Sequence, residues 1–401
     1  MNIILIWLNK SVKLMLNMRK DGFLKKILIL SNSSGGLYNF RFELIKKLTD
    51  LNYEVFFSVP QDITDNKVKL LIETGANFIH TPMNRRGMNP IEDLKLINLY
   101  KKIVNDIYPD IVLTYTIKPN IYGNYVANKF KIPVIMNITG IGTSLSTGRF
   151  KWIIKKMYKY ACNKANMIFF QNEGNYNFFI SNNLVNNQKT ILIPGSGVNL
   201  EKFKPVIKPK KDNVIRFIFI GRVMKDKGIE EYLEAAKRLV SKVENLEFNI
   251  LGSFEELEFK NIIEQNSNGR IKYLGVSNDV RKEISEIDCI VNPSYHEGMS
   301  NVLLEGAAMG KPLLASNIPG CKEIVDDGVN GFLFEPKSID SLEEAIIKFV
   351  SLSDEDRKNM GQKSREKVEK GFDRNIVINQ YIKVIKAILG EGAINESIWE
   401  N

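Results

Sequence analysis

The stretch "DCIVNPSYHEGMSNVLLEG", residues 288–306, decides the fold, because it joins an apolar run to a helical pattern through a short loop. The run before the proline is typical of a strand buried in a parallel sheet. Ser300 or Asn301 is a natural N-cap for the helix that follows. This pattern predicts that Glu297 stands in the loop and Glu305 one turn inside the helix.

The same alternation of short apolar runs and helical periods extends in both directions along the chain. It runs from "KKILILSN" to "QKTILIPGSG" in the first half, and from "VIRFIFIGR" to "GFLFEP" in the second. Such runs predict parallel strands covered by helices on both faces. The stretch "EKFKPVIKPKKDN" between the halves predicts a linker. The expected fold class is therefore α/β, with two doubly wound, Rossmann-like domains facing across a cleft.

Length and composition agree with two ordinary globular domains. The chain has 401 residues, of which 44% are hydrophobic and 25% charged, enough for two separate cores. Three cysteines without metal-binding spacing fit a reducing cytoplasm, and two histidines exclude a histidine-rich metal site. The one D-x-D pattern, residues 354–356, is typical of acids at a helix start. We expect no metal.

Positive charge is concentrated in the first half. Residues 1–205 carry 28 Lys and Arg against 13 Asp and Glu, a balance of +15. The remaining residues carry 28 against 33, a balance of −5. Residues 149–164, within "GRFKWIIKKMYKYACNK", predict a basic amphipathic helix that binds an anionic membrane surface. A solvated helix face over a core is the alternative. Nucleic acid is a weaker one, because no recognition motif accompanies the charge.

The N-terminal residues 1–20 are also basic. Their apolar run, "NIILIWL", is too short to span a bilayer and has no cleavage site. They predict either a second helix on the membrane surface or, if translation starts at Met18, a dispensable extension.

Two further turns carry residues suited to phosphate chemistry. "SNSSGGLYNF" follows the first strand, and the amides near Gly36 favour an anionic group, although a tight turn alone explains the glycines nearly as well. In "GRVMKDKG", Arg222 ends a strand and Lys227 precedes a helix. Two cations there suit a diphosphate leaving group and would neutralise its charge without a metal.

Three stretches together resemble the retaining family-4 (group 1) glycosyltransferases of GT-B fold. They are "GRVMKDKGIEEYLEAAKRL", "IPGSGVNLEKFKP", and the long stretch from "NPSYHEG" to "GFLFEP". The resemblance spans residues 25–390 and is strongest in the second half. "TYTIKPNIYG" and "NITGIGTS" are similar to the branch that builds bacterial surface glycans on polyprenyl diphosphates, including N-acetylgalactosaminyl and galactosyl transferases.

The resemblance implies a role for both glutamates of the opening stretch. Glu297 would contact the transferred sugar and stabilise positive charge at its anomeric carbon. Glu305 would accept hydrogen bonds from the ribose hydroxyls. The backbone of the loop and helix start would meet the diphosphate at Gly298, Met299, Ser300 and Asn301.

The sequence departs from this family in the first half, where many relatives carry a histidine. Ile117 lies near that point, and its backbone carbonyl would still reach the sugar. His80 lies in the loop "FIHTPMNRRG" and does not replace the histidine. Lys118 is a candidate for phosphate or acceptor binding, and Arg85 and Arg86 are further acceptor candidates.

The resemblance also implies a division of the chain into four parts. They are an N-terminal extension (1–24), an acceptor- and membrane-facing domain (25–205), a nucleotide-sugar-binding domain (206–375), and a C-terminal helix returning to the first domain (376–401). No cofactor is expected, since the UDP-sugar is a co-substrate.

The activity implied is metal-independent transfer from a UDP-sugar, with retention, to a polyprenyl-diphosphate-linked saccharide at the inner face of the cell membrane. A UDP-sugar 2-epimerase is the alternative enzyme. A non-catalytic nucleotide-sugar-binding component of a glycan assembly complex is the alternative from another class.

Overall fold

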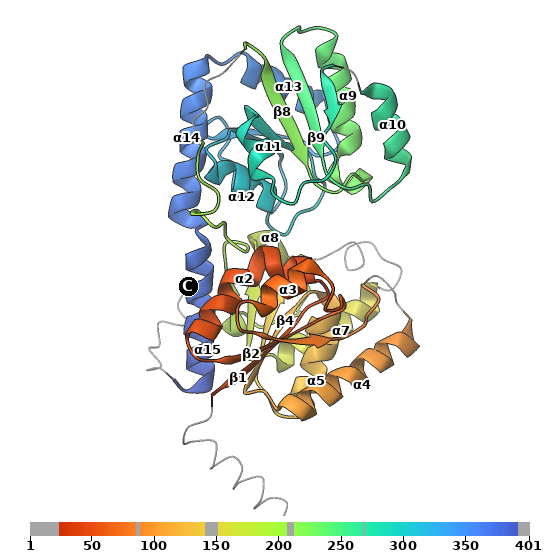
Figure 1. Cartoon of the computed structure of the whole chain (residues 1–401), viewed down its shortest axis with the longest axis vertical. Helices are drawn as coiled ribbons and strands as arrows, with labels where there is room; N and C mark the ends of the chain where they lie inside the picture. The colour runs from red at the N-terminus through yellow and green to blue at the C-terminus, as the bar shows by residue number, and fades with distance from the viewer. Residues whose placement is uncertain (1–23, 86–88, 141–150, 207–211, 268, 392–401) are drawn as a thin grey trace, which may run out of the picture. The chain divides into compact units, whose positions relative to one another are not determined.

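The structure is a computed structural model that describes residues 24–85, 89–140, 151–206, 212–267 and 269–391. It contains two parallel sheets with helices on their faces (Figure 1). The first sheet has the strand order β3-β2-β1-β4-β5-β6-β7, and the second has the order β10-β9-β8-β11-β12-β13. In each, the order reverses beside the first strand of the set, as in doubly wound folds. The predicted α/β class with two doubly wound, Rossmann-like sheets is confirmed.

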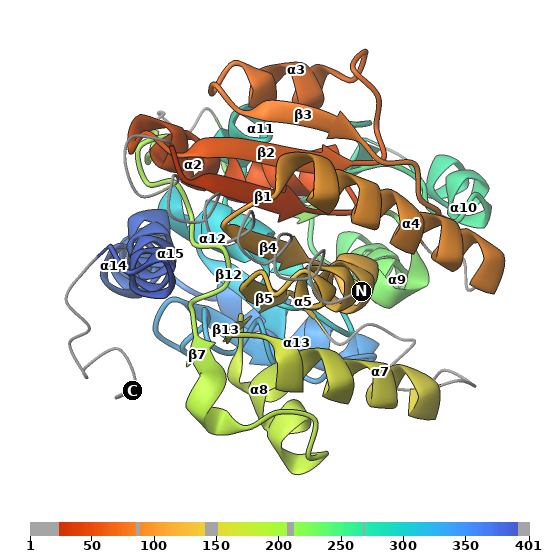
Figure 2. The same cartoon turned by 90° about the horizontal axis from the view of Figure 1, so that it is seen from below.

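The elements of the first sheet come from the first half of the chain, and Figure 2 shows its strands from β3 to β4 side by side. The strands are β1 (Lys26–Leu30), β2 (Glu54–Val59), β3 (Asn77–His80), β4 (Ile111–Tyr115), β5 (Val134–Ile138), β6 (Met167–Phe170) and β7 (Thr190–Leu192). The helices are α2 (Ser34–Asp50), α3 (Asn66–Ile72), α4 (Pro90–Ile107), α5 (Asn124–Lys129), α7 (Lys151–Lys164) and α8 (Glu173–Ser181), with the π-turn η1 (Pro119–Gly123) and the 3₁₀ turn η2 (Asn187–Lys189).

The second sheet is built in the same way from the second half. Its strands are β8 (Ile215–Ile220), β9 (Leu246–Leu251), β10 (Ile271–Tyr273), β11 (Cys289–Asn292), β12 (Leu313–Ser316) and β13 (Gly331–Phe334). Its helices are η3 (Lys225–Lys227), α9 (Ile229–Val240), α10 (Glu258–Asn266), α11 (Arg281–Ser285), α12 (Asn301–Ala308), α13 (Ile339–Val350) and α14 (Asp354–Gly371). The helix α15 (Arg374–Leu389) follows.

Alternate residues of the second sheet enter two separate cores. Phe217 of β8 packs in one core with residues of α9, α10 and α13. Its neighbour Ile218 packs in the other with residues of α11 and α12. Because successive side chains of a strand point to opposite faces, a sheet with two apolar faces must be covered twice. This burial fixes α12 against the sheet.

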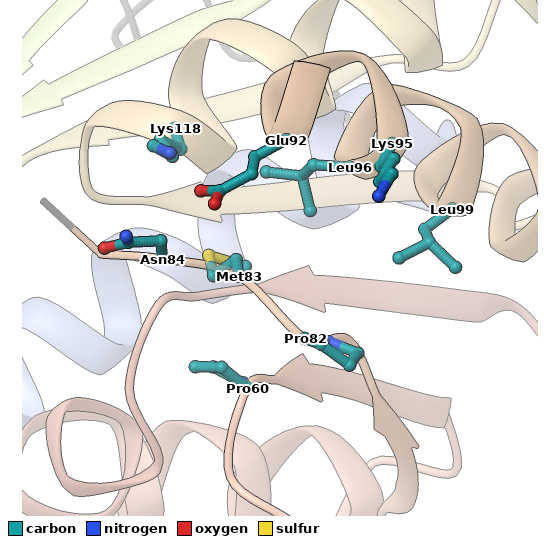
Figure 3. A pocket seen from close by; sticks show the side chains of 9 residues that line it. All are labelled: Pro60, Pro82, Met83, Asn84, Glu92, Lys95, Leu96, Leu99 and Lys118. Atoms are coloured by element: carbon teal, nitrogen blue, oxygen red, sulfur yellow. The ribbon is translucent and has the colours of Figure 1, made fainter. Parts of the chain in front are cut away.

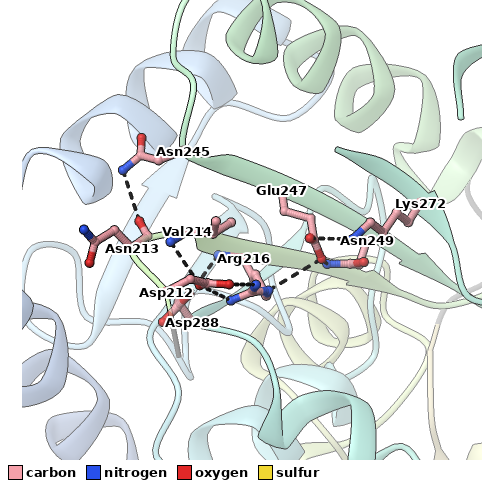
Figure 4. Close-up of polar contacts among 9 residues, drawn as sticks. All are labelled: Asp212, Asn213, Val214, Arg216, Asn245, Glu247, Asn249, Lys272 and Asp288. Carbon is pink, nitrogen blue, oxygen red and sulfur yellow. Dashed lines mark hydrogen bonds and ion pairs between the residues drawn. The ribbon is translucent and has the colours of Figure 1, made fainter. Parts of the chain in front are cut away.

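The amino-terminal edge of the second sheet is held by charged side chains (Figure 4). Arg216 forms two contacts with the Asp212 carboxylate, at 2.9 and 2.6 Å, and its amide donates to Asp288 at 2.8 Å. Lys272 and Arg216 both approach Glu247, at 2.6 and 3.7 Å. The charges of this edge are therefore paired with one another. In doubly wound folds, ligands bind at the opposite, carboxyl edge of the sheet.

Several local predictions are confirmed and others need correction. The basic helix before Lys164 and the helix after Ser300 are present. The glycine pair at Gly36 does not form a tight turn, because both glycines lie in the first turn of α2. His80 ends strand β3 instead of lying in a loop. The sequence did not predict α3, β3 or α8.

Some predictions concern residues outside the described part of the chain. They are the N-terminal membrane helix (1–20) with the alternative start at Met18, Arg86, Arg149 at the start of the basic stretch, and the linker lysines at 210–211. Among the described residues, no helix combines the length and apolar character that crossing a bilayer requires.

Candidate functional site

Two turns meet at the carboxyl edge of the second sheet. One leads from β8 through η3 into α9, and the other leads from β11 into α12, and β8 and β11 are paired neighbours. The amide of Tyr295 donates to the carbonyl of Asp226 at 3.0 Å. Gly228 has φ +73°, and a Cβ there would lie 2.1 Å from the carbonyl oxygen of Pro293. Only glycine allows the turns to approach so closely.

Lys227 and Glu297 are the two site residues that this approach brings into contact. The Lys227 ammonium donates to Glu297 Oε1 at 2.6 Å. Their side chains are 21% and 15% exposed, so the pair is shielded but still reachable from solvent. A cation just before α9 and an acid in the loop before α12 together supply both signs of charge needed to bind a phosphorylated sugar.

A hydrogen bond behind this pair was not predicted from the sequence. The Tyr295 hydroxyl donates to Glu231 Oε1 at 2.6 Å, and Glu231 lies in the first turn of α9. The Lys337 ammonium lies 4.8 Å from the centre of the Tyr295 ring. The hydrogen bond between Tyr295 and Glu231 links the loop before Glu297 to the helix after Lys227. The partners are 64 positions apart, so no local pattern could reveal them.

The start of α12 is capped as the sequence predicts. Ser300 Oγ accepts from the Leu303 amide at 3.4 Å and from the side chain of Asn292. The Ser300 amide, however, donates to the Gly320 carbonyl at 2.9 Å, so it is already engaged. Within the described part of the chain, the amides of Asn301 and Val302 donate to no group. These two amides are the better candidates for an anion.

Met299 and Gly298, the other two residues of the predicted phosphate loop, are packed against the protein interior. Met299 is 5% exposed and belongs to the core that contains α12. The backbone of Gly298 lies against Gly320, where a Cβ would lie 2.8 Å from the Gly298 carbonyl oxygen. Met299 therefore contributes to the site through its backbone position rather than through its thioether.

Glu305 lies on α12, one turn after the cap. Burial of its carboxyl raises the pKa of Glu305 to about 7, and the positive charges of Arg374 and Lys202 partly oppose that increase. An acid with this pKa is close to half ionised at neutral pH. Its ionisation is therefore costly unless a ligand supplies hydrogen-bond donors.

Arg222 does not join the Lys227–Glu297 pair. It lies two residues beyond β8 and pairs with Glu255 at 3.5 Å, and its side chain is 48% exposed. An exposed ion pair of this kind contributes little to stability. Moving the Arg222 guanidinium away from Glu255 therefore costs little free energy.

The site residues predicted in the first half lie at the carboxyl edge of the first sheet. The Gly36 amide donates to Ser33 Oγ at 3.2 Å, so the helix cap already engages it. Ile117 is half-buried and follows β4 by two residues. Lys118 is only 12% exposed and pairs with Asp93 at 2.8 Å. Arg85 is exposed.

At the carboxyl edge of the second sheet, the structure brings the predicted residues Lys227 and Glu297 into contact and places Glu305 on the helix α12 that follows. In the described ranges, no three His, Cys, Asp or Glu side chains gather in a group that could hold a metal ion.

Comparison with protein-family models gives two matches. Residues 200–367 match the family described as "Glycosyl transferases group 1", and residues 26–172 match "Glycosyl transferase 4-like".

Two curated relatives cover most of the chain. One is the N,N'-diacetylbacillosaminyl-diphospho-undecaprenol alpha-1,3-N-acetylgalactosaminyltransferase of Campylobacter jejuni, 29% identical over 91% of this chain and 99% of the relative. The other is the UDP-Gal:alpha-D-GlcNAc-diphosphoundecaprenol alpha-1,3-galactosyltransferase of Escherichia coli, 30% identical over 75% of this chain and 81% of the relative.

Solved structures show the same fold at lower identity. A glycosyltransferase from Rickettsia africae has a TM-score of 0.76 at 22% identity, covering 92% of this chain and 100% of its own. The Anabaena protein HepE, solved with UDP-glucose, has a TM-score of 0.74 at 18% identity, covering 90% and 99%.

The raised pKa of Glu305 predicts a stability effect. Between pH 4.5 and 7 the folded chain holds a proton that the unfolded chain has lost, so the free energy of unfolding falls as pH rises. Glu305→Gln should remove up to about 3 kcal/mol of this dependence and should stabilise the protein at pH 8. Urea unfolding of both proteins at pH 5 and pH 8 measures it. The same pH dependence in both would contradict the assignment.

Proposed function

The chain belongs to the family-4, group 1 glycosyltransferases, and we propose that it transfers a sugar from a UDP-sugar to a saccharide on a polyprenyl diphosphate. The two curated relatives, named for transfer to undecaprenyl-diphosphate-linked sugars, support this acceptor. The contact between Lys227 and Glu297 beside the start of α12 is the observation that carries the proposal. It supplies charges for both the phosphate and the sugar.

The donor is proposed to lie across these two turns. The diphosphate takes the place of Glu297 as partner of the Lys227 ammonium and accepts from the amides of Asn301 and Val302. Glu297, released from Lys227, turns to the sugar. The ribose hydroxyls donate to the carboxylate of Glu305, whose ionisation they would favour. Donor binding thus exchanges one internal ion pair for contacts to ligand.

Transfer is proposed to proceed with retention, which gives an α-linkage. The bond between the anomeric carbon and the β-phosphate oxygen breaks, and a bond from the acceptor oxygen forms on the same face. The acceptor proton passes to the departing diphosphate. Glu297 stabilises the positive charge that develops at the anomeric carbon, where an electrostatic contact is worth most.

The leaving group is proposed to need no metal ion. Lys227 faces it directly, and Arg222 is free to turn from its exposed pair with Glu255 toward the same phosphates. Two cations at the diphosphate do the work that a divalent cation does elsewhere.

We propose that α7 binds the membrane, because the proposed acceptor is a membrane lipid. This binding would place the enzyme at the inner face of the cell membrane. The helix buries Ile154 and Tyr158 in the domain. Trp152 is 57% exposed, and the Lys156 ammonium lies 5.2 Å from the centre of its ring. Lysines beside exposed aromatic rings suit an anionic lipid interface.

The alternative functions are not favoured by the comparisons, and their products differ. A UDP-sugar 2-epimerase would release an isomerised nucleotide sugar without any acceptor. A non-catalytic binding component would bind UDP-sugar and release no UDP. The testing experiment is a UDP-release assay that screens UDP-sugars against a lipid-linked saccharide, with the anomeric configuration of the product read by NMR.

Replacing the acid of the central pair should separate chemistry from binding. Glu297→Ala should lower kcat by about 10²-fold or more, because it removes the charge beside the anomeric carbon. UDP binding, measured by calorimetry, should persist. Glu344→Ala, an exposed acid on α13, is the matched control and should be fully active. Full activity of Glu297→Ala would remove Glu297 from the mechanism.

Reversing charge on the exposed face of α7 should weaken membrane binding. We expect Lys156→Glu with Lys159→Glu to lower the affinity for anionic vesicles at least about tenfold, since each lysine near the surface contributes roughly 1 kcal/mol. Sedimentation with anionic and neutral vesicles measures it. The control changes the same charge on α14, at the exposed Lys358 and Lys370. Equal losses in both variants would show that α7 is no specific contact.

A further inference from the structure

A cavity of about 510 Å³ lies at the carboxyl edge of the first sheet, where the turns after β2, β3 and β4 meet the N-terminal half of α4 (Figure 3). We infer that it holds the isoprenoid segment next to the diphosphate of the acceptor, an inference that rests on the proposed function. Its size falls in the range of small-ligand pockets.

The walls of the cavity are mainly hydrocarbon. Pro60 and Pro82 follow β2 and β3, Met83 adds a thioether, and α4 contributes Leu96 and Leu99. Prolines have no backbone N–H, and methionine adapts its shape to irregular partners. Such walls suit a branched, flexible hydrocarbon, which gains free energy by leaving water and needs no hydrogen bonds.

The α4 side of the cavity is one stripe of the helix. Glu92, Lys95, Leu96 and Leu99 are spaced three and four residues apart, so they share a face. Leu96 is 2% exposed, whereas Leu99 is 36% exposed. The two leucines therefore extend the apolar surface from the core of the domain to the cavity, where the described residues leave Leu99 partly exposed.

The charged side chains that line the cavity are Glu92, Lys95 and Lys118, and they balance once Asp93, the partner of Lys118, is included. Lys118 and Glu92 lie toward one end, and Leu99 lies toward the other (Figure 3). Lys118 is paired with Asp93 at 2.8 Å, and the same carboxylate accepts from the hydroxyl of Tyr122 at 2.8 Å. A nucleotide or free phosphate would find little net positive charge here. An uncharged chain enters without breaking these pairs, and its anionic head stays outside.

A saccharide fits these walls less well than an isoprenoid. Sugar recognition needs many convergent hydrogen-bonding groups, and apolar walls leave sugar hydroxyls without partners. Among the described residues that line this cavity, none carries an aromatic ring. The hydrocarbon of the proposed acceptor is the part whose chemistry matches the walls.

Binding of farnesyl diphosphate to the full chain tests this inference. Equilibrium dialysis is performed with saturating UDP, so that the nucleotide site is filled. Farnesyl diphosphate should bind at least tenfold more tightly than inorganic diphosphate. Leu99→Asn should lower that affinity about tenfold, since burying one leucine contributes about that much. Met83→Gln, on the opposite wall, should do the same.

Leu94→Asn is the matched control, because Leu94 lies on α4, is 60% exposed, and does not line the cavity. It should bind farnesyl diphosphate as the wild type does, and melting temperatures verify that all variants are folded. Equal affinity for the two diphosphates, or equal losses at Leu94 and Leu99, would overturn the inference. Failure of the proposed function would appear separately, as absence of UDP release by the wild type with any lipid-linked saccharide.

Discussion

The ion pair between Lys227 and Glu297 links the turns after β8 and β11 at the carboxyl edge of the second sheet. It exists because two neighbouring parallel strands end at the same edge, and because Gly228 lets their turns touch. The hydrogen bond between Tyr295 and Glu231 is a second link between the loop before Glu297 and helix α9. Each member of the pair is the other's counter-ion, and in the proposed mechanism a ligand with a phosphate and a sugar replaces both contacts. A site arranged in this way is preorganised without leaving either charge unpaired.

Glu305 shows a different balance between stability and function. Burial raises the pKa of its carboxyl to about 7, so only about half of the molecules carry this charge at neutral pH, and Arg374 only partly offsets the effect of burial. A glutamine would be easier to bury. The proposed ribose contact explains the acid, because hydroxyl donors stabilise the carboxylate and ligand binding then lowers the cost of its charge.

Local sequence patterns predicted the elements with strong periods and clear caps. The helix after Ser300 followed from its cap and apolar face, and the two sheets followed from repeated buried runs. Strand β3 was not predicted because it is an edge strand without a fully buried residue, and its sequence therefore lacks a buried apolar run. The pairing of Lys118 with Asp93, 25 positions apart, and of Tyr295 with Glu231 arises only from tertiary structure. The residues of the proposed site were chosen from the sequence, whereas the side chains that contact them could be found only in the fold.

The most direct test of the proposed donor site is a crystal structure of the chain with a bound UDP-sugar. We expect the diphosphate at the amides of Asn301 and Val302, with the Lys227 ammonium moved from Glu297 to a phosphate oxygen. Glu305 should contact the ribose. A UDP-sugar bound elsewhere, with the 2.6 Å contact between Lys227 and Glu297 unchanged, would contradict the assignment.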